Sequence, residues 1–514
     1  MIYPYQSFYE MIHANAMDKP NKTVVFIEKE KISNLHLLQK VDSFCRFLSH
    51  EGIGQGDKLA LILPNSLEFL IAFCATSKIG AVVVPVNNML KKEEYTYILN
   101  DAEVKILLTS KKYAEQTQNL QSTTTVQKTV WIDEIPSVEG EHFLFSEAMS
   151  IPPFKDEVRE STTISDLAVL IYTSGTTGHP KGAMLSYKNI FSNLYGAQDR
   201  FELNSKDRFI TYLPMFHSFT LSISVLLPIY IGGSMVIIPS ILPFSNIIKE
   251  TLLKRVTVFL GIPDVYNALI RAKLPWYFLW FNSVRAFISG GAALSEDTLT
   301  RFNGIFKRAK MLEGYGLSEC SPAVSINPVN KQKPLSIGIP LKGYEVKIVD
   351  EEMVEVSIGE VGELIVKGDC VMMGYWKRPS ATDDTIINGW LRTGDLAKID
   401  EEGYIYIVDR KKDLIISKGI NIYPREIEEV LYHHPSIKAA AVIGIKDDKS
   451  GEVPVAYIEL DTEETSVSEA DMKKYLKEHL ANFKTPKHIY FLDELPKNAT
   501  GKVLKRVLKE KHLN

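Results

Sequence analysis

A run rich in glycine and hydroxyl residues, with one lysine, is the strongest chemical signal in the sequence. Residues 172–182 read YTSGTTGHPKG and follow an apolar stretch, 167–171, that is typical of a β-strand. Backbone N–H groups, hydroxyls and the cation of Lys181 in such a loop could surround a polyphosphate. The other candidate phosphate-binding residues in this run are Thr173, Ser174, Gly175, Thr176, Thr177 and Gly178. The run is not a Walker A loop, because Gly182 follows the lysine where that motif has Ser or Thr, and a plain surface loop is the alternative.

Further runs of this kind follow along the chain. They are LPMFH at 213–217, SGGAAL at 289–294, GYGLSE at 314–319, GWLRTGD at 389–395, VDRKKD at 408–413, KGINIYPREIE at 418–428 and PKNATGK at 496–502. In this order and spacing the sequence resembles the adenylate-forming superfamily, which unites acyl-CoA synthetases, adenylation domains of peptide synthetases and firefly-type luciferases. It is most like the bacterial ligases that join medium- or long-chain fatty acids to coenzyme A. The resemblance covers essentially the whole chain and implies ATP, Mg²⁺ and coenzyme A as cofactors.

Activation of a carboxylate by ATP joins two anions, so the site must supply cations and N–H donors to the phosphates. Lys181, Lys502 and the loop hydroxyls can supply them. The resemblance implies that Glu319 binds the Mg²⁺, a hard ion that prefers oxygen ligands, and that Ser318 contacts a phosphate. It also implies nucleotide contacts from Gly291, Ala292, Ala293, Tyr315 and Gly316, and ribose contacts from Asp395 and Arg410. Taken singly, such residues are more often a solvated carboxylate, a core aromatic or a turn residue.

The substrate class depends on a long stretch without charge. Residues 209–248 include no Asp, Glu, Lys or Arg. An adenylation domain for amino acids pairs the ammonium group with an Asp shortly after the run that corresponds to 213–215, and 216–222 has no carboxylate, so an unpaired ammonium would be costly to bury. An apolar tunnel for an aliphatic or aryl acid is favoured instead. Its expected lining residues are Phe216, Phe219, Gly261 and Gly314, with His217 at the carboxylate entrance or, alternatively, as a core histidine.

The C-terminal runs indicate two steps on one site. Lys502 lies on a turn-rich loop that could present its cation to the reacting carboxylate and the α-phosphate. In the family the small domain then rotates about a hinge, which corresponds to Lys412, and brings Lys418 and Gly419 to the site for thiol attack. Gly419 would allow close approach of the backbone to the thiol arm. The alternative for Lys412 is a solvated member of a basic run, and Ile416 stands where some relatives have a lysine.

The elements that must position these residues follow from the hydrophobic pattern. Apolar and amphipathic stretches alternate at 58–63, 66–79, 81–86, 93–100 and 104–108, and apolar runs return at 236–238, 256–260 and 286–289. This rhythm predicts βαβ layers with mostly parallel strands, and short strands with Gly turns after about 337 predict a β-rich part. The expected fold is α/β: a large N-terminal domain, 1–411, of two βαβ-type subdomains plus a β-rich subdomain binds AMP and the acyl group. A small mobile α+β C-terminal domain, 412–514, follows.

Composition excludes several classes of protein. With 59 Lys and Arg against 63 Asp and Glu in 514 residues, the net charge of -4 does not favour nucleic acid binding. Four scattered cysteines without a CxxC pair predict neither a zinc site nor disulfides, and the start lacks a signal peptide, so a cytoplasmic protein is expected. Repeated Pro and Gly in 209–248 argue against a spanning helix. Contact with the inner face of the membrane is compatible with a fatty substrate, and the sequence leaves open whether the protein is a homodimer.

Other functions remain as alternatives. An aryl-acid CoA ligase, or an acyl-AMP ligase that loads a carrier-protein thiol, would use the same machinery, and so would a luciferase-like oxygenase. A hydrolase is weaker, because the nearest approach to Gly-x-Ser-x-Gly, at 316–320, ends in Cys. A silent binding protein would not need Lys181, Glu319, Asp395 and Lys502 together.

Overall fold

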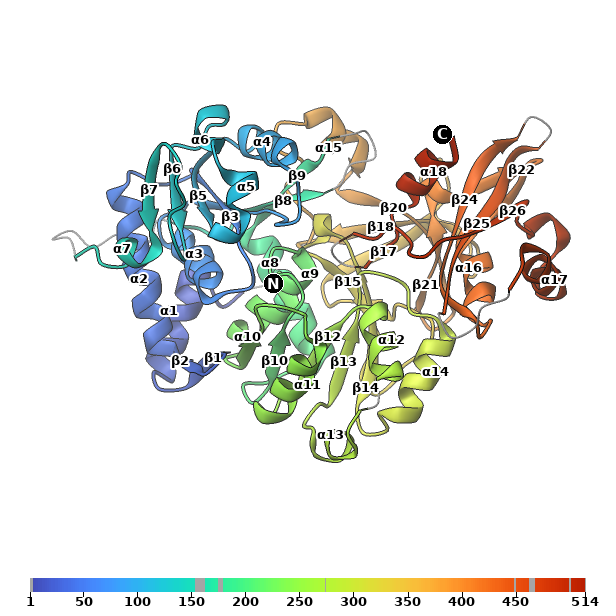
Figure 1. Cartoon of the computed structure of the whole chain (residues 1–514), viewed down its shortest axis with the longest axis horizontal. Coiled ribbons are helices and arrows are strands. Elements are labelled where there is room, and N and C mark those ends of the chain that lie inside the picture. The colour runs from blue at the N-terminus through green and yellow to red at the C-terminus, as the bar shows by residue number, and fades with distance from the viewer. Residues whose placement is uncertain are drawn as a thin grey trace.

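A computed structural model of the chain describes residues 3–152, 162–173, 179–272, 274–447, 450–461, 467–498 and 501–513. Two largely parallel sheets form the large N-terminal domain (Figure 1). One has the order β7 (Glu141–Leu144), β6 (Lys128–Trp131), β5 (Val104–Thr109), β3 (Lys58–Ile62), β4 (Val82–Pro85), β8 (Leu167–Thr173) and β9 (Lys181–Ser186). The other has the order β16 (Ile339–Pro340), β15 (Ala323–Ile326), β14 (Lys310–Gly316), β13 (Ala286–Ser289), β12 (Val258–Gly261), β10 (Arg208–Thr211), β11 (Ser234–Ile237), β1 (Thr23–Ile27) and β2 (Glu30–Ser33).

Helices connect and cover these strands. Apolar α3 (Leu67–Lys78) is buried along nearly its whole length, because it packs against α1 (Phe8–Asp18) and α2 (Asn34–His50). Ser66 caps α3 by accepting a hydrogen bond from the backbone N–H of Phe69 at 3.2 Å. The remaining helices of the large domain are α4 (Lys92–Asp101), α5 (Ala114–Thr117), α6 (Leu120–Thr123), α7 (Phe145–Ala148), α8 (Tyr187–Arg200), α9 (Ser218–Thr220), α10 (Leu227–Tyr230), α11 (Phe244–Leu253), α12 (Pro263–Arg271), α13 (Trp276–Phe281), α14 (Glu296–Ile305) and α15 (Pro379–Thr385).

The charge-free stretch folds into largely buried strand and helix over 209–238, as its sequence predicts, whereas most of 239–248 is exposed. It runs from β10 through α9, a π-helical turn at Leu221–Leu226 and α10 into β11. Within the described ranges no helix has both the length and the apolar character needed to cross a membrane. A π-helical turn often accompanies a functional site, and this one follows α9, which His217 caps.

Two smaller sheets complete the chain. The β-rich part has the order β17 (Tyr344–Val349), β18 (Gly362–Gly368), β20 (Trp390–Ile399) and β19 (Ile386–Ile387), and β21 (Ile405–Arg410) also pairs with β20. The small C-terminal domain has the order β23 (Ile420–Ile422), β22 (Ile415–Ser417), β25 (Gly451–Leu460) and β24 (Ile437–Asp447), with β26 (His488–Phe491) beside β25 and the helices α16 (Pro424–Tyr432), α17 (Glu469–His479) and α18 (Lys505–Leu513).

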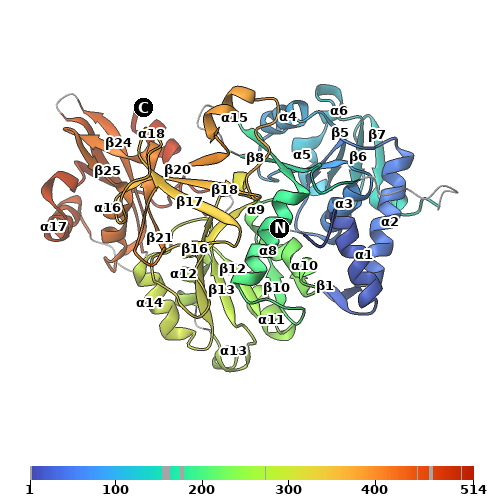
Figure 2. The ribbon, with the colours of Figure 1, turned by 180° about the vertical axis from the view of Figure 1, so that it is seen from behind.

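The predicted α/β class, with a large and a small domain, is confirmed. Seen from behind, the small domain lies beside α12 and α14 of the large domain (Figure 2). Ion pairs join the two, Lys497 to Asp264 at 3.0 Å and Arg271 to Asp461 at 3.1 Å. The predicted boundary between 411 and 412 falls between β21 and β22 and stays a prediction, as does the mobility of the small domain.

Candidate active site

The hairpin of β8 and β9 carries the predicted phosphate loop. Thr173 and Lys181 are partners in the register of the hairpin, and they form its last pair before the connecting loop. Both side chains therefore lie where the chain leaves and re-enters the sheet. The predicted residues Ser174, Gly175, Thr176, Thr177 and Gly178 lie outside the described residues.

Glu319 lies beside this hairpin. It belongs to a short 3₁₀-helix, Ser318–Cys320, that follows β14. Its Oε1 accepts hydrogen bonds from the Thr173 hydroxyl at 3.3 Å and from the Tyr375 hydroxyl at 3.0 Å. The Nζ of Lys181 lies 5.2 Å from the centre of the Tyr375 ring. The predicted residues Thr173, Lys181 and Glu319 thus gather around Tyr375, which the sequence did not indicate.

Backbone hydrogen bonds explain how Tyr375 reaches this place. The segment around it pairs antiparallel with β9: Met184 N–H donates to the Gly374 carbonyl at 2.9 Å, and Trp376 N–H donates to the Gly182 carbonyl at 2.8 Å. No local pattern in 372–376 reveals this pairing. Ser218 is a second residue that the sequence did not indicate: its hydroxyl lies 3.0 Å from that of Ser318 and joins α9 to the 3₁₀-helix that carries Glu319.

The predicted nucleoside residues meet on the β-rich sheet. Asp395 on β20 is paired in register with Arg410 on β21, and the Arg410 Nε lies 3.4 Å from Asp395 Oδ1. The Tyr315 hydroxyl, on β14, donates to Asp395 Oδ2 at 2.5 Å. Burial and the nearby carboxylate raise the pKa of Tyr315, so the phenol keeps its proton. Asp395 is only 7% exposed, which leaves little of its carboxylate open to water.

A buried ion pair supports the turn that presents Asp395. Arg392 binds the Glu363 carboxylate at 2.6 Å, and the same carboxylate accepts the N–H of Gly394 at 3.3 Å. The Asp395 N–H in turn donates to the Thr393 hydroxyl at 3.1 Å. The part of β20 just before the aspartate is therefore held by both an ion pair and hydrogen bonds.

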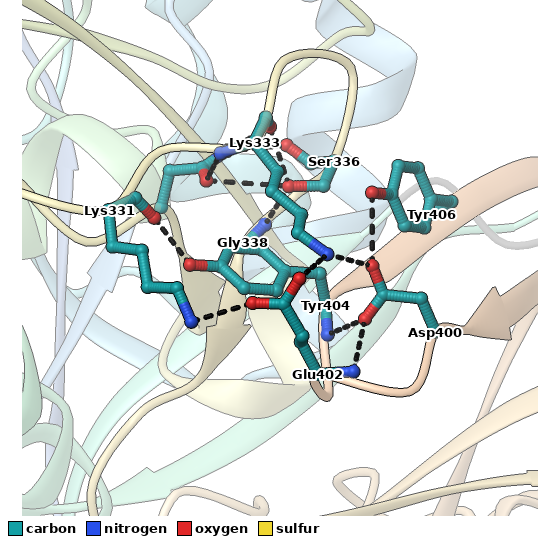
Figure 3. Close-up of polar contacts among 9 residues, drawn as sticks. Lys331, Lys333, Ser336, Gly338, Asp400, Glu402, Tyr404 and Tyr406 are labelled. Carbon is teal, nitrogen blue, oxygen red and sulfur yellow. Dashed lines mark hydrogen bonds and ion pairs between the residues drawn. The ribbon is translucent and has the colours of Figure 1, made fainter.

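A second polar network fixes the far end of β20 and β21 (Figure 3). Lys333 lies between two carboxylates, 2.6 Å from Asp400 and 2.7 Å from Glu402, at the turn that joins the strands. The Tyr406 hydroxyl donates to Asp400 at 3.3 Å. Lys333 follows β15, so this network joins the hairpin that carries Asp395 to the second parallel sheet.

The predicted adenine segment is open to a ligand. Gly291, Ala292 and Ala293 are exposed between β13 and α14, at the carboxyl end of a parallel strand, where ligands bind in open α/β sheets. Gly316 is likewise exposed at the end of β14.

His217 begins the buried α9 segment. Its Nδ1 accepts the N–H of Phe219 at 3.4 Å, which places any ring proton of the neutral form on Nε2. Burial lowers the pKa of His217 to about 4, so the ring is neutral at neutral pH. The histidine is therefore both a helix cap and a group near the start of the apolar stretch.

The expected acyl-pocket residues pack closely. Phe216 is buried, and the Phe219 ring lies where a side chain on Gly290 would be, 2.7 Å from a Cβ there. A Cβ on Gly261 would meet the Tyr266 ring at 2.7 Å, and one on Gly314 would meet Ile326 at 3.3 Å. The two predicted glycines thus make room for neighbouring side chains of the protein itself.

The loop with Lys502 docks against the large domain. Its Gly501 lies so close to Ile262 and Asp264 that a Cβ there would be 2.8 Å from the Ile262 side chain. Burial, and next the positive charge of Arg410, lower the pKa of the half-buried Lys502 to about 8, whereas Asp395 opposes this shift. Lys502 therefore lies within electrostatic reach of Arg410 and Asp395.

The other predicted C-terminal residues lie elsewhere. Lys412 follows Arg410 in a 3₁₀ turn at the start of the small domain and is exposed. Lys418 and Gly419 form the exposed turn between β22 and β23, and Lys418 N–H donates to the Ser450 carbonyl at 2.8 Å. β22 lies toward the outer edge of the small domain (Figure 1). The structure thus brings Lys502, and not the Lys418 turn, to the site.

Comparisons with known proteins agree with this arrangement. A family model described as AMP-binding enzyme matches residues 12–376, and its C-terminal domain model matches 426–502. A long-chain-fatty-acid–CoA ligase of Escherichia coli O157:H7 is 33% identical over 98% of this chain and 94% of its own length. A 2-succinylbenzoate–CoA ligase of Bacillus cereus is 33% identical over 96% of both chains. The crystal structure of ATP-bound MatB from Rhodopseudomonas palustris superimposes with a TM-score of 0.90, at 30% identity and 98% coverage of both chains.

Proposed function

The chain belongs to the AMP-binding enzyme family and is an acid–CoA ligase that acts through an acyl-AMP, and we propose that its acid is a medium- or long-chain fatty acid. The observation that carries the proposal is the largely buried part of the charge-free stretch, 209–238, which starts within β10 and continues past His217 to β11. An alkyl chain needs apolar contacts and no counter-ion.

An aryl acid is the second candidate, because one relative is named for 2-succinylbenzoate. That acid has a second carboxylate, which needs a cation or several hydrogen bonds when it is buried. The stretch 209–248 offers no cation. A monocarboxylic acid with an alkyl chain therefore fits it better.

For the first half-reaction we propose that the residues around Tyr375, namely Thr173, Lys181 and Glu319, bind the phosphates of ATP. A carboxylate oxygen of the acid attacks the α-phosphorus of ATP, the bond from that phosphorus to pyrophosphate breaks, and acyl-AMP forms. Lys181 would neutralise the leaving pyrophosphate, and Lys502 would neutralise charge at the attacking carboxylate and the α-phosphate. Asp395 would accept the ribose hydroxyls, with Arg410 and Tyr315 fixing its carboxylate.

The oxygen donors at Glu319 fit a magnesium ion. Mg²⁺ in nucleotide enzymes is bound by one or two carboxylates together with substrate phosphates, and here one carboxylate and the Thr173 hydroxyl lie 3.3 Å apart. When bound, the ion would offset phosphate charge during the reaction. Tyr375 would keep Glu319 pointed toward it.

The second half-reaction joins the acyl group to coenzyme A. The thiolate sulfur attacks the acyl carbon, and AMP leaves with the electrons of the broken bond. We propose that the small domain turns at Lys412 for this step, since Lys502 occupies the site and the Lys418 turn lies outside it. An acyl-AMP ligase for a carrier-protein thiol would follow the same two steps and differ only in the thiol that accepts the acyl group.

The test is pyrophosphate release with a panel of acids, measured with and without coenzyme A. Saturated fatty acids of 6 to 18 carbons, benzoate and 2-succinylbenzoate form the panel, and Lys502→Ala is the inactive control. We expect kcat/KM to rise with alkyl length and thioester to form only with free coenzyme A. A maximum with an aryl acid, or thioester formation on a carrier protein alone, would replace the proposal by the corresponding alternative.

A further inference from the structure

The largest group of exposed aromatic side chains among the described residues lies on α13. Trp276, Tyr277, Trp280 and Phe281 are 70%, 47%, 63% and 68% exposed within this six-residue helix. Leu253, at the end of neighbouring α11, is also exposed. Together these five residues are the α13 patch. Isolated exposed apolar residues are ordinary, but a contiguous patch of large aromatics indicates an interaction site.

The fold holds α13 firmly, so the exposure is not that of a loose loop. Phe278 is 2% exposed and anchors the helix to the core. Asn282 donates its side-chain amide to the Phe278 carbonyl at 2.7 Å, and Arg308 donates to the Trp280 carbonyl at 2.9 Å. The Arg308 guanidinium also lies 5.1 Å from the Trp280 ring centre. The aromatic side chains are thus presented outward by a fixed helix.

The surroundings of the patch are basic. The sequence has no Asp or Glu from 265 to 295 or from 298 to 312. The exposed side chains of Lys307, Arg308 and Lys310 form no ion pair with a carboxylate of the described ranges. Lys310 opens β14, and its N–H donates to the carbonyl of Arg285, a few residues after α13. A partner with negative charge is therefore favoured over a neutral or basic one.

The position of α13 separates it from the active site. The helix precedes the first residue of β13, whereas the adenine segment follows the last residue of that strand. Both views show α13 at the outer end of the second parallel sheet, beside α11 (Figures 1 and 2). Substitutions in the patch should therefore leave the chemistry intact.

We propose that the α13 patch docks on the surface of an anionic lipid bilayer. Trp and Tyr prefer the boundary between headgroups and acyl chains, and nearby Lys and Arg are attracted to anionic lipids. At six residues the helix is about 9 Å long, far too short to span a bilayer, so it lies in the interface. The inference goes beyond the proposed reaction and does not depend on which acid is activated.

Sedimentation with vesicles tests the proposal on the full chain, without substrates. The probes are vesicles of phosphatidylcholine alone and of phosphatidylcholine with an equal amount of phosphatidylglycerol. We expect partitioning at least tenfold stronger onto the anionic vesicles, weakened by salt. The triple variant Trp276→Ser, Trp280→Ser, Phe281→Ser should lose at least tenfold, and Lys307→Glu with Lys310→Glu should lose severalfold.

A matched control replaces exposed aromatics elsewhere. Phe483→Ser with Tyr490→Ser, 44% and 40% exposed in the small domain, should bind vesicles within twofold of the wild type. Equal binding by the wild type and the triple variant would overturn the proposal. The proposal would also be overturned if analytical ultracentrifugation in vesicle-free buffer showed a wild-type dimer and a monomeric triple variant. The patch would then be an interface between copies of the chain.

Fluorescence keeps the test independent of how well the triple variant folds. Brominated lipids quench tryptophans that enter the interface, and we expect the wild type to be quenched on anionic vesicles. The conservative change Trp276→Phe with Trp280→Phe should preserve binding and remove most of the quenching. Bound wild type without quenching would show that another surface makes the contact and would also overturn the proposal.

Discussion

Tyr375 donates its hydroxyl to Oε1 of Glu319 at 3.0 Å, and Thr173 donates to the same oxygen at 3.3 Å. The carboxylate is therefore aimed by two hydroxyls from different segments. Both bonds end on Oε1, so the lone pairs of Oε2 are the ones left by the described residues for a cation or for water.

Tyr375→Phe should weaken use of magnesium. Loss of a hydrogen bond to a charged group costs about 1.5 to 3 kcal/mol, which corresponds to a roughly ten- to hundredfold higher Mg²⁺ requirement. The measurement is pyrophosphate release against Mg²⁺ concentration. Tyr172→Phe is the matched control, because the Tyr172 hydroxyl donates to Asp101 at 2.7 Å instead of to Glu319. A Mg²⁺ requirement that rises equally in both variants would contradict the assigned role.

Sequence reasoning found Glu319 and not Tyr375, and the reason is physical. The glutamate belongs to a local run, GYGLSE, with a distinctive composition. The tyrosine depends on the antiparallel pairing of 372–376 with β9, set by backbone hydrogen bonds between segments about 190 residues apart. A long-range contact of that kind leaves no periodic or compositional mark on either segment.

Asp395→Ala and removal of the ribose hydroxyls from the nucleotide should have non-additive effects on the KM for the nucleotide. If Asp395 binds the ribose, either change alone should raise the KM for ATP roughly tenfold or more, since a hydrogen bond to a charged group is lost. The two changes together should then cost little more than one. Steady-state pyrophosphate release with ATP and with 2′,3′-dideoxy-ATP gives the cycle. Full additivity would place the ribose elsewhere.

Glu363→Gln should destabilise the fold more than a Glu→Gln substitution at an exposed position does. Burial alone would raise the pKa of the Glu363 carboxyl, but Arg392 holds it below its ordinary value. The stabilisation is thus present above the unfolded pKa of about 4.3 and lost as pH falls through the lower folded value. We expect a loss of about 3 kcal/mol near pH 7 by denaturant unfolding. Because the pair would then contribute nothing, the variant should also lose less stability than the wild type on acidification.

Glu351→Gln provides the comparison for that experiment. Its carboxylate is exposed and lies 3.8 Å from Lys411, so we expect a change below about 0.5 kcal/mol. Equal losses in the two variants would mean that the Glu363 pair does not support the turn at Asp395.

More of the fold than of the candidate site could be predicted from the sequence. Apolar runs predicted strands at 58–63 and 286–289, where the structure has β3 and β13, because a buried strand must be apolar whatever its neighbours are. Whether His217 is a ligand group or a core residue could not be decided from sequence. The structure shows its Nδ1 used as a cap, a hydrogen bond that depends on the local backbone and not on residue type.

Lys502 should give the adenylation step an alkaline limit near pH 8. Burial lowers its pKa to about 8, and the charged form is the one that can neutralise the carboxylate and α-phosphate, so kcat/KM for ATP should fall as pH rises through that value. An ordinary lysine would leave the profile flat to about pH 10. Lys502→Arg should move the limit upward, because a guanidinium stays charged. Lys502→Ala should lower the rate roughly two to three orders of magnitude at every pH, by analogy with loss of an oxyanion donor.

Lys497→Ala separates this effect from docking of the loop. Lys497 lies on the same segment and pairs with Asp264 at 3.0 Å, so its loss loosens the contact between the domains without removing the cation near Asp395. We expect a modest drop in rate with the alkaline limit unchanged, measured as pyrophosphate release from pH 6.5 to 10. A wild-type profile that is flat through pH 9.5, or a limit that moves with Lys497→Ala, would assign the titration to another group.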